Sequence, residues 1–378
     1  MGSIRCWAAD ASASVADLGV LVPLVAAITL GNGLDAATVL VGFGAVYILS
    51  GLYFRLPVPV QPIKAAAAVA IARDLPAETI AVAGIVLGAV LTFVAAAGLV
   101  PRLERLFELP LVRGLQLGVG LMLLRSALDV AGSATSVLIA AGIVVVLVIA
   151  ARRPHPLPLA LPIVAVGAAA AASGGAFPHL ELSLWSPSLA TGEVDAATIL
   201  SAVMLLVVPQ IPLTLGNAVV AVAELEQRYY PGSARRATPQ RFAASSGIVN
   251  VVAGAIGAMP MCHGSGGLTA HFRAGARSFR MNLVIGMALL ILGLFLGPAA
   301  VGILGAIPAS VLAGALGFTG VFHSSLAASL RGRDLVTAVT VGIVGLLTMN
   351  LTLGLVAGLC THRAPGFGHR RREIAEAV

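Results

Sequence analysis

Two short stretches of the sequence combine helix-breaking residues with groups that can bind an anion. The first, Leu56–Ala65, reads LPVPVQPIKA, and the second, Met259–Leu268, reads MPMCHGSGGL. The three prolines of the first stretch favour extended backbone, and the last of them suits the first turn of a helix. The glycines of the second stretch break a helix, and Ser265 is a suitable N-cap. We therefore expect each stretch to be an extended segment that leads into the N-terminus of a short helix.

A lysine at the start of the first short helix supports the anion interpretation. Unpaired N–H groups and the positive end of the dipole make a helix N-terminus an anion site. Lys64 is the only lysine in the chain and lies in that first turn, where the dipole disfavours a cation. At membrane depth this charge costs several kcal/mol unless something compensates it. Two helix ends of roughly +0.5 charge each and one ammonium sum to roughly +2, which matches a dianion. The alternatives are that Lys64 reaches the membrane interface or pairs with a carboxylate.

Other polar residues would complete such a site. Gln210, Thr214 and Asn217 recur at helical spacing and would share one helix face if the helix continues past Pro212, as cavity lining or as hydrogen bonds between helices. His263 would donate a hydrogen bond or carry a proton, or it would be a structural imidazole bonded to the backbone. The candidate substrate-binding residues are Gln61, Pro62, Lys64, His263, Gly264, Ser265, Gly266, Gly267, Gln210 and Asn217.

Two carboxylates join His263 as candidates for proton coupling. Asp17 opens the first apolar segment and Glu224 closes the eighth, and either would carry a proton if it is buried. The alternatives are a helix N-cap for Asp17 and a solvated helix end for Glu224. Cys262 and His263 lack further metal ligands, and the sequence has neither a Walker A motif nor a nucleophile–base set. We therefore predict no enzyme activity, no metal and no cofactor.

The composition places these residues in a membrane protein. The chain has 378 residues, of which 58% are hydrophobic and 10% are charged, against about 25% charged in soluble domains. So few charges cannot cover a soluble globule of this size, and the apolar surface must face lipid. The first apolar run, Leu18–Leu30, is short enough to resemble a signal-peptide core, but we interpret it as a transmembrane helix because spans follow it throughout. We expect apolar segments near residues 18–31, 36–54, 61–72, 79–100, 112–128, 135–151, 157–177, 196–222, 242–258, 264–272, 282–298, 300–324, 334–347 and 348–361.

The charges between these segments predict the orientation. With a cytoplasmic N-terminus and alternating sides, the inside loops and the tail hold most arginines, while the outside loops are mainly acidic. The net charge of +7 is therefore no indication of nucleic-acid binding. We expect a multi-pass protein of the plasma (inner) membrane with both termini in the cytoplasm and a cytoplasmic tail over 362–378.

An internal repeat predicts the domain organisation. Shifting the chain by 203 residues places Gly44 on Gly247, Gly51 on Gly254 and Pro57 on Pro260. The offset is seven segments, an odd number, so the two copies would have opposite orientations, as in many transporters. We expect one repeat over 1–177 and another over 196–361, with a core of segments 1–4 and 8–11 and a gate of segments 5–7 and 12–14. Chance matching in an Ala/Gly/Val-rich sequence is the alternative.

The chain resembles the molybdate transporter family, a relative of the sulfate permeases. The resemblance rests on Pro57–Ala65 and on Met259–Arg277, with weaker support from Asp17–Gly19 and Pro209–Asn217. It departs from the family at the first helix, where Ala16 and Val20 replace the usual Gly and Thr. Only a short basic tail follows the last expected segment, so we expect a protein outside the branch of the sulfate permeases proper, which carry a large soluble C-terminal domain. The resemblance implies an all-α membrane fold of seven-plus-seven inverted repeats with two half-helices, and uptake of molybdate between the two motifs.

The predicted function is secondary active import of a tetrahedral oxyanion, molybdate first, by alternating access. Sulfate or tungstate on the same scaffold is the first alternative, and a nucleobase is a weaker one. A non-transporting membrane scaffold or receptor is the alternative of a different class. The expected partners are the oxyanion and the lipid bilayer, with symport of a coupling ion and a homodimer left open.

Overall fold

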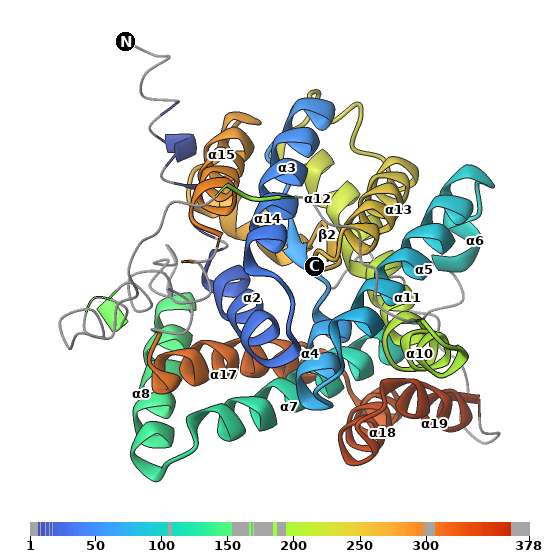
Figure 1. Ribbon diagram of the computed structural model, residues 1–378. Coiled ribbons are helices and arrows are strands. Elements are labelled where there is room, and N and C mark those ends of the chain that lie inside the picture. The colour runs from blue at the N-terminus through green and yellow to red at the C-terminus, as the bar shows by residue number, and fades with distance from the viewer. Residues whose placement is uncertain are drawn as a thin grey trace.

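The computed structural model of the protein is built almost entirely of helices (Figure 1). It describes residues 18–104, 108–152, 194–297 and 307–363, and also residues 7, 9–11, 13–14, 16, 166–167, 169, 184–186 and 299. The first half contains α2 (Leu18–Asn32), α3 (Ala36–Phe54), β1 (Gln61–Pro62), α4 (Lys64–Ala72), α5 (Ala77–Ala96), α6 (Val100–Glu104), α7 (Leu109–Ala131) and α8 (Ala134–Ala151). The second half contains α10 (Ala196–Ser201), η1 (Ala202–Val207), α11 (Val208–Leu213), η2 (Thr214–Val220), α12 (Ala221–Tyr229), α13 (Pro239–Ala255), β2 (Met261–Cys262), α14 (Ser265–Arg273), α15 (Arg280–Phe295), α17 (Ala309–Ser325), η3 (Leu326–Ser329), α18 (Gly332–Thr348) and α19 (Leu351–Arg363).

The expected apolar segments agree with these helices wherever the chain is described. Five helical stretches are long and apolar enough to cross a membrane, namely Ala36–Phe54, Ala77–Ala96, Leu109–Ala131, Ala196–Tyr229 and Ala309–Ser329. The third expected segment is shorter than predicted, because Gln61–Pro62 is a strand and the helix begins at Lys64. The segment expected at 157–177 lies outside the described residues, and in the segment expected at 300–324 the described helix begins at Ala309.

Local signals in the sequence explain several helix ends. Asp35 is the N-cap of α3, where its carboxylate accepts hydrogen bonds from the Thr38 backbone N–H at 2.8 Å and from the Thr38 hydroxyl at 2.6 Å. Helix α7 has Pro110 in its first turn and ends at Gly132, whose φ of 66° favours glycine. The ends of both helices are therefore readable from residue type.

Two short strands from distant parts of the chain pair with each other. Strands β1 and β2 are antiparallel, with Gln61 opposite Cys262 and Pro62 opposite Met261. Each strand leads directly into a short helix, α4 or α14. The expected extended segments and short helices are therefore present, and the pairing brings the two helix starts together.

Two buried asparagines hold the extended backbone on either side of the strands. Asn250 accepts a hydrogen bond from the Met261 N–H and donates one to the Met261 carbonyl, both at 2.8 Å. Asn282 does the same for Val58, accepting from its N–H at 3.0 Å and donating to its carbonyl at 2.6 Å. Extended backbone deep in a membrane protein needs such partners, because lipid supplies none.

The helices cross closely at pairs of glycines. A Cβ added to Gly44 would lie 2.8 Å from the Gly286 carbonyl oxygen, where α3 crosses α15. A Cβ on Gly88 would lie 2.6 Å from the Gly247 carbonyl oxygen, where α5 crosses α13. Small residues at such crossings let backbones approach each other, as in membrane helix pairs. The high glycine content of the chain thus serves close packing.

The helices fall into two groups in space. Helix α3 packs on α15 and α5 on α13, while α7 packs on α17 and α18 and α17 packs on α8. In Figure 1, α7, α8, α17, α18 and α19 lie along the lower side, and α3, α13, α14 and α15 lie above them. Helix α4 contacts α2, α7 and α11 and therefore lies at the boundary between the groups.

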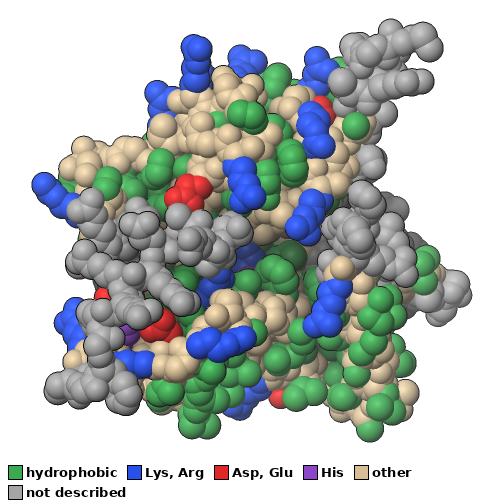
Figure 2. All heavy atoms as spheres, turned by 180° about the vertical axis from the view of Figure 1, so that it is seen from behind, with side chains coloured by type: hydrophobic (Ala, Val, Ile, Leu, Met, Phe, Trp, Pro, Cys, Tyr) green, Lys and Arg blue, Asp and Glu red, His purple; other side chains and the backbone are tan. Residues whose placement is uncertain are grey.

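Large apolar side chains cover much of the outer surface. Leu138 on α8 and Leu347 on α18 are 74% and 77% exposed. In Figure 2, which shows the molecule from behind, hydrophobic side chains dominate the lower right, whereas Lys and Arg gather toward the top. An apolar surface of this extent is typical of helices that face lipid.

Candidate functional site

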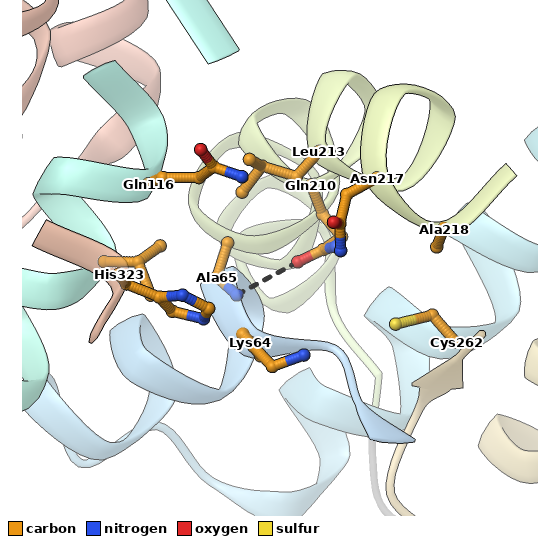
Figure 3. Close-up of a pocket in the computed structure, with 10 residues that line it drawn as sticks. Lys64, Ala65, Gln116, Gln210, Leu213, Asn217, Ala218, Cys262 and His323 are labelled. Atoms are coloured by element: carbon orange, nitrogen blue, oxygen red, sulfur yellow. Dashed lines mark hydrogen bonds between the residues drawn. The ribbon is translucent and has the colours of Figure 1, made fainter. Parts of the chain in front are cut away.

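A small cavity lies beside the start of α4, at the boundary between the two groups of helices (Figure 3). Its volume is about 30 Å³, more than the roughly 10–15 Å³ that one bound water molecule needs. It is lined by Lys64, Ala65, Gln116, Val119, Gln210, Leu213, Asn217, Ala218, Cys262 and His323. The cavity therefore brings together Lys64, Gln210 and Asn217, three of the residues expected from the sequence.

Lys64 is half-buried and bonded to an amide. Its Nζ donates a hydrogen bond to Gln61 Oε1 at 2.5 Å. A Cβ added to Gly264 would overlap Gln61 Oε1 and lie 3.3 Å from Lys64 Nζ, so the second motif passes directly beside this pair. In the described parts of the chain, Lys64 forms no ion pair with a carboxylate. The ammonium thus lies between the two motifs with a neutral oxygen as its partner.

The first N–H groups of α4 are held by a side chain from another helix. Ala65 N and Ala66 N donate to Gln210 Oε1 at 3.2 and 3.3 Å, and Gln210 Nε2 donates to the Thr214 hydroxyl at 3.0 Å. Residue Ile63, at the N-cap, provides no side-chain hydrogen bond. An amide oxygen therefore occupies the position where a helix N-terminus binds an anion.

Gln210 reaches this position because its helix is irregular. Helix α11 carries Pro209 in its first turn and Pro212 inside, and it lies between two π-helical stretches, η1 and η2. Proline removes a backbone hydrogen bond, and π-helical turns often occur at functional sites. The helix nevertheless continues past Pro212, so Gln210, Thr214 and Asn217 lie on one continuous helical stretch.

The start of α14 lies next to the cavity without lining it. Its N-cap, Gly264, supplies no side-chain hydrogen bond, and the Ser265 hydroxyl donates to Asn217 Oδ1. Gly266 is exposed, and a Cβ there would meet nothing within 4 Å. Gly267 is buried in the same first turn. The second helix end is thus close to the Lys64–Gln61 pair, with open space beside Gly266.

His263 points away from the cavity. Its Nδ1 lies 3.0 Å from the Pro59 carbonyl oxygen and its Nε2 lies 3.0 Å from the Ser245 hydroxyl. The ring packs edge-on against Phe54 and Phe242. Both ring nitrogens bond to protein, as expected for the structural imidazole that was one interpretation of this residue. Pro62 lies in β1 and also does not line the cavity.

Of the two carboxylate candidates for proton coupling, the structure describes Glu224 but not Asp17. Asp17 lies outside the described residues. Glu224 is exposed on α12. Glu226, two residues later, is fully buried, and neither carboxylate oxygen of Glu226 has a hydrogen-bond partner among the described residues. Helical spacing would have found Glu226, because it follows the buried Val222 by four residues.

Three cavity residues that carry polar or sulfur groups were not among the site residues expected from the sequence. Gln116 comes from α7, Cys262 from β2 and His323 from α17. Cys262 lies in the second motif and reaches the cavity through the pairing of β1 with β2, whereas Gln116 and His323 reach it because α7 packs on α4 and α17 packs on α7. The complete set offers an ammonium, amide and imidazole groups and backbone N–H groups. Such a set can hold an anion by hydrogen bonds, and it contains no nucleophile–base arrangement.

Comparison with known proteins identifies the chain. A family model described as "Molybdate transporter of MFS superfamily" matches residues 9–123 and 202–322. The chain belongs to this molybdate transporter family. Molybdate transporter 1 of Arabidopsis thaliana is 34% identical over 94% of the chain and 87% of the relative. Molybdate transporter 2 of the same plant is 27% identical over 86% of the chain and 80% of the relative. The family consists of transporters rather than enzymes.

Solved structures show the fold of this molybdate transporter family member. The transmembrane domain of the cyanobacterial bicarbonate transporter BicA has a TM-score of 0.70 at 15% identity, over 94% of the chain and 98% of BicA's. SLC26A9 has a TM-score of 0.61 at 15% identity, over 94% of the chain and 64% of its own. The fold is therefore that of sulfate permease-type membrane transporters. The family description names the MFS superfamily. The structure is nevertheless similar to BicA and SLC26A9, and we assign the fold from this similarity.

Proposed function

We propose that the chain carries molybdate across the membrane, with the anion held between the starts of α4 and α14. The observation that carries this proposal is the Lys64 ammonium beside the N-terminus of α4. Lys64 Nζ donates to the amide oxygen of Gln61, and the first N–H groups of α4 donate to the amide oxygen of Gln210, so no carboxylate occupies these donors. An incoming oxyanion replaces those acceptors and gains the charge of Lys64 and of the helix ends. The names of the similar plant proteins support molybdate as the first substrate.

Binding requires side chains of the site to move. The donors of the site are already taken, since Gln61 Oε1 accepts from Lys64 and Gln210 Oε1 accepts from Ala65 N and Ala66 N. The oxyanion must therefore displace Gln61 Oε1 from Lys64, and Gln210 Oε1 from Ala65 and Ala66, as the surrounding helices separate.

An inverted repeat would provide the movement. The packing of the helices supports this part of the proposal. In the repeat, α3 corresponds to α13 and α5 corresponds to α15, so the contact of α3 with α15 is the counterpart of the contact of α13 with α5. The contact of α7 with α18 and that of α17 with α8 are exchanged in the same way. We assign α2–α5 and α10–α15 to a core that carries the site and α7, α8 and α17–α19 to a gate, and the core moves against the gate in alternating access.

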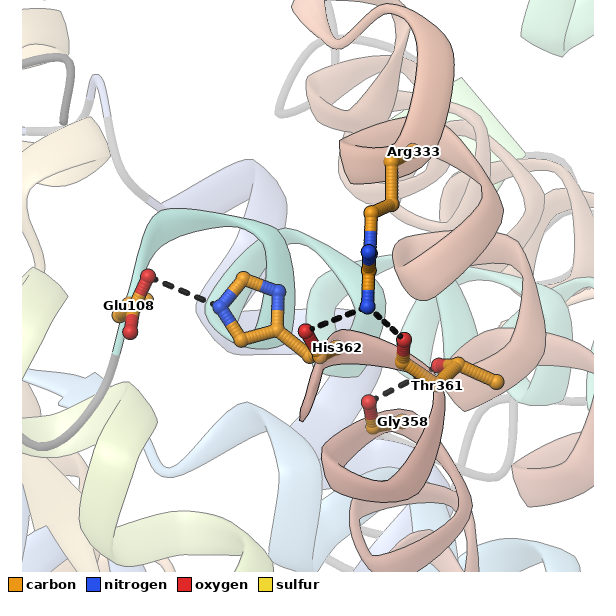
Figure 4. Close-up of polar contacts among 5 residues, drawn as sticks. All are labelled: Glu108, Arg333, Gly358, Thr361 and His362. Atoms are coloured by element: carbon orange, nitrogen blue, oxygen red, sulfur yellow. Dashed lines mark hydrogen bonds and ion pairs between the residues drawn. The ribbon is translucent and has the colours of Figure 1, made fainter. Parts of the chain in front are cut away.

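Contacts between distant loops support the alternation of sides. The Arg73 guanidinium donates to the backbone carbonyls of Thr348 and Met349, both at 2.7 Å, and both loops are expected outside. Glu108 and His362 form an ion-pair contact at 2.9 Å, and Arg333 donates to the carbonyls of Thr361 and His362 (Figure 4). The cytoplasmic side is where the sequence places all four residues, Glu108, Arg333, Thr361 and His362. Cytoplasmic termini and an inner-membrane location remain part of the proposal.

Uptake of labelled molybdate into proteoliposomes that contain the purified chain tests the function. Accumulation above that of empty liposomes, with competition by sulfate and tungstate measured in parallel, is the expected result. Preferential competition by sulfate would make sulfate the substrate, whereas no uptake of any tetrahedral oxyanion would leave only a scaffold or receptor role. Imposed proton and sodium gradients in the same assay identify the coupling ion and decide whether the protein is a symporter.

A further inference from the structure

The lining of the cavity includes, beside Lys64, a buried histidine to which no role has been assigned so far (Figure 3). His323 lies near the end of α17, is 9% exposed and lines the cavity. Its Nδ1 is buried and has no hydrogen-bond partner among the described residues. In Figure 3 the imidazole points toward Lys64 and Ala65. An unpaired buried polar atom is costly, so its presence at a binding cavity calls for a ligand.

We infer that His323 is a substrate-binding residue that donates a hydrogen bond from Nδ1 to the oxyanion from the gate side. This inference rests on the proposed function and adds a ligand that the two motifs do not contain. Lys64 and the α4 N–H groups supply donors from one side only, and a tetrahedral oxyanion has acceptor oxygens on all sides. A donor from α17 reaches the oxygens that point away from α4.

The position of His323 links binding to movement. Helix α17 packs on α7, α8 and α2, whereas Lys64 belongs to α4, which carries the anion site. An anion held by both residues therefore connects α4 to α17. A ligand favours one conformation only through contacts that differ between conformations. The Nδ1 bond is such a contact, because it exists only when α17 lies against the loaded α4.

The test compares four substitutions in the full chain. His323→Ala removes both ring nitrogens, His323→Asn keeps a donor at the position of Nδ1, and His323→Gln keeps one only at the position of Nε2. Thr319→Val, one turn earlier on α17, is the matched control, since Thr319 is also buried and its hydroxyl donates to the Ala315 carbonyl of its own helix. Sodium molybdate is the probe, measured by calorimetry with protein in lipid nanodiscs and by uptake in proteoliposomes.

The expected result is a rise of about tenfold or more in Kd and KM for His323→Ala and His323→Gln, from loss of a hydrogen bond to a charged ligand. His323→Asn should stay within about threefold of the parent, and Thr319→Val should match it. Equal binding by the parent and His323→Ala overturns the inference alone. Equal loss in all three His323 variants overturns the Nδ1 assignment. Failure of the parent protein to bind molybdate overturns the proposed function and this inference together.

Discussion

Replacing Lys64 with methionine separates the charge of this side chain from its bulk. In the empty protein, Lys64 Nζ bonds to Gln61 Oε1 at 2.5 Å. In the loaded protein it faces the anion, where two unit charges 4 Å apart interact by about 4 kcal/mol at an effective dielectric constant of about 20. A hydrogen bond to a charged group contributes roughly 1.5–3 kcal/mol. We therefore expect Lys64→Met to weaken molybdate binding by roughly 2–4 kcal/mol, about 30- to 1,000-fold in Kd.

The same change removes the hydrogen bond that Lys64 Nζ donates to Gln61 Oε1, so stability must be measured separately from binding. A hydrogen bond with a charged partner contributes roughly 1.5–3 kcal/mol, and Lys64→Met should lower the unfolding temperature accordingly. The double variant Gln61→Met, Lys64→Met removes both partners and should regain most of that stability without regaining binding. Lys64→Arg keeps the charge and should retain part of the binding. A Kd for Lys64→Met within threefold of the parent, by calorimetry in nanodiscs, would refute the reasoning.

Three further predictions concern the surroundings of the site. Gln210→Glu places a carboxylate on Ala65 N and Ala66 N, so it should abolish uptake while raising stability by about 0.3–2 kcal/mol. Unimpaired uptake would show that the anion binds elsewhere. Gly264→Ala forces Gln61 and Lys64 apart and should reduce affinity, whereas Gly266→Ala meets open space and should not; calorimetry of both variants checks this. Gly88→Ala should disrupt the crossing of α5 with α13, while Gly142→Ala touches nothing within 4 Å. The yield of monodisperse protein compares the two, and equal yields would contradict the packing argument.

The motifs of the site could be read from the sequence because their signals are local. Prolines and glycines interrupt a helix through backbone geometry alone, so Leu56–Ala65 and Met259–Leu268 predicted the strands and the short helices. A single lysine in an apolar chain predicted the charged group. The positions of the helices followed from the same local rule, since apolar length is a property of the segment itself.

The remaining features depend on tertiary packing and were out of reach. His323 and Gln116 become cavity residues only because α7 packs on α4 and α17 packs on α7. His263 belongs to the second motif, but its ring nitrogens bond to the Pro59 carbonyl and the Ser245 hydroxyl instead of facing the cavity. Nor does sequence indicate that Gln210 is the side chain that caps α4, because an amide on one helix gives no sign of the helix end that it will meet.

The amide oxygens of Gln61 and Gln210 already accept hydrogen bonds from the donors of the proposed anion site. Any solute must compete with two internal acceptors that are already in place, at about 2.5 Å from the ammonium and 3.2–3.3 Å from the helix end. Chloride, abundant and singly charged, offers too little in exchange, whereas a doubly charged oxyanion offers several strong acceptor atoms at once. For the proposed site, we therefore expect chloride to compete poorly with molybdate.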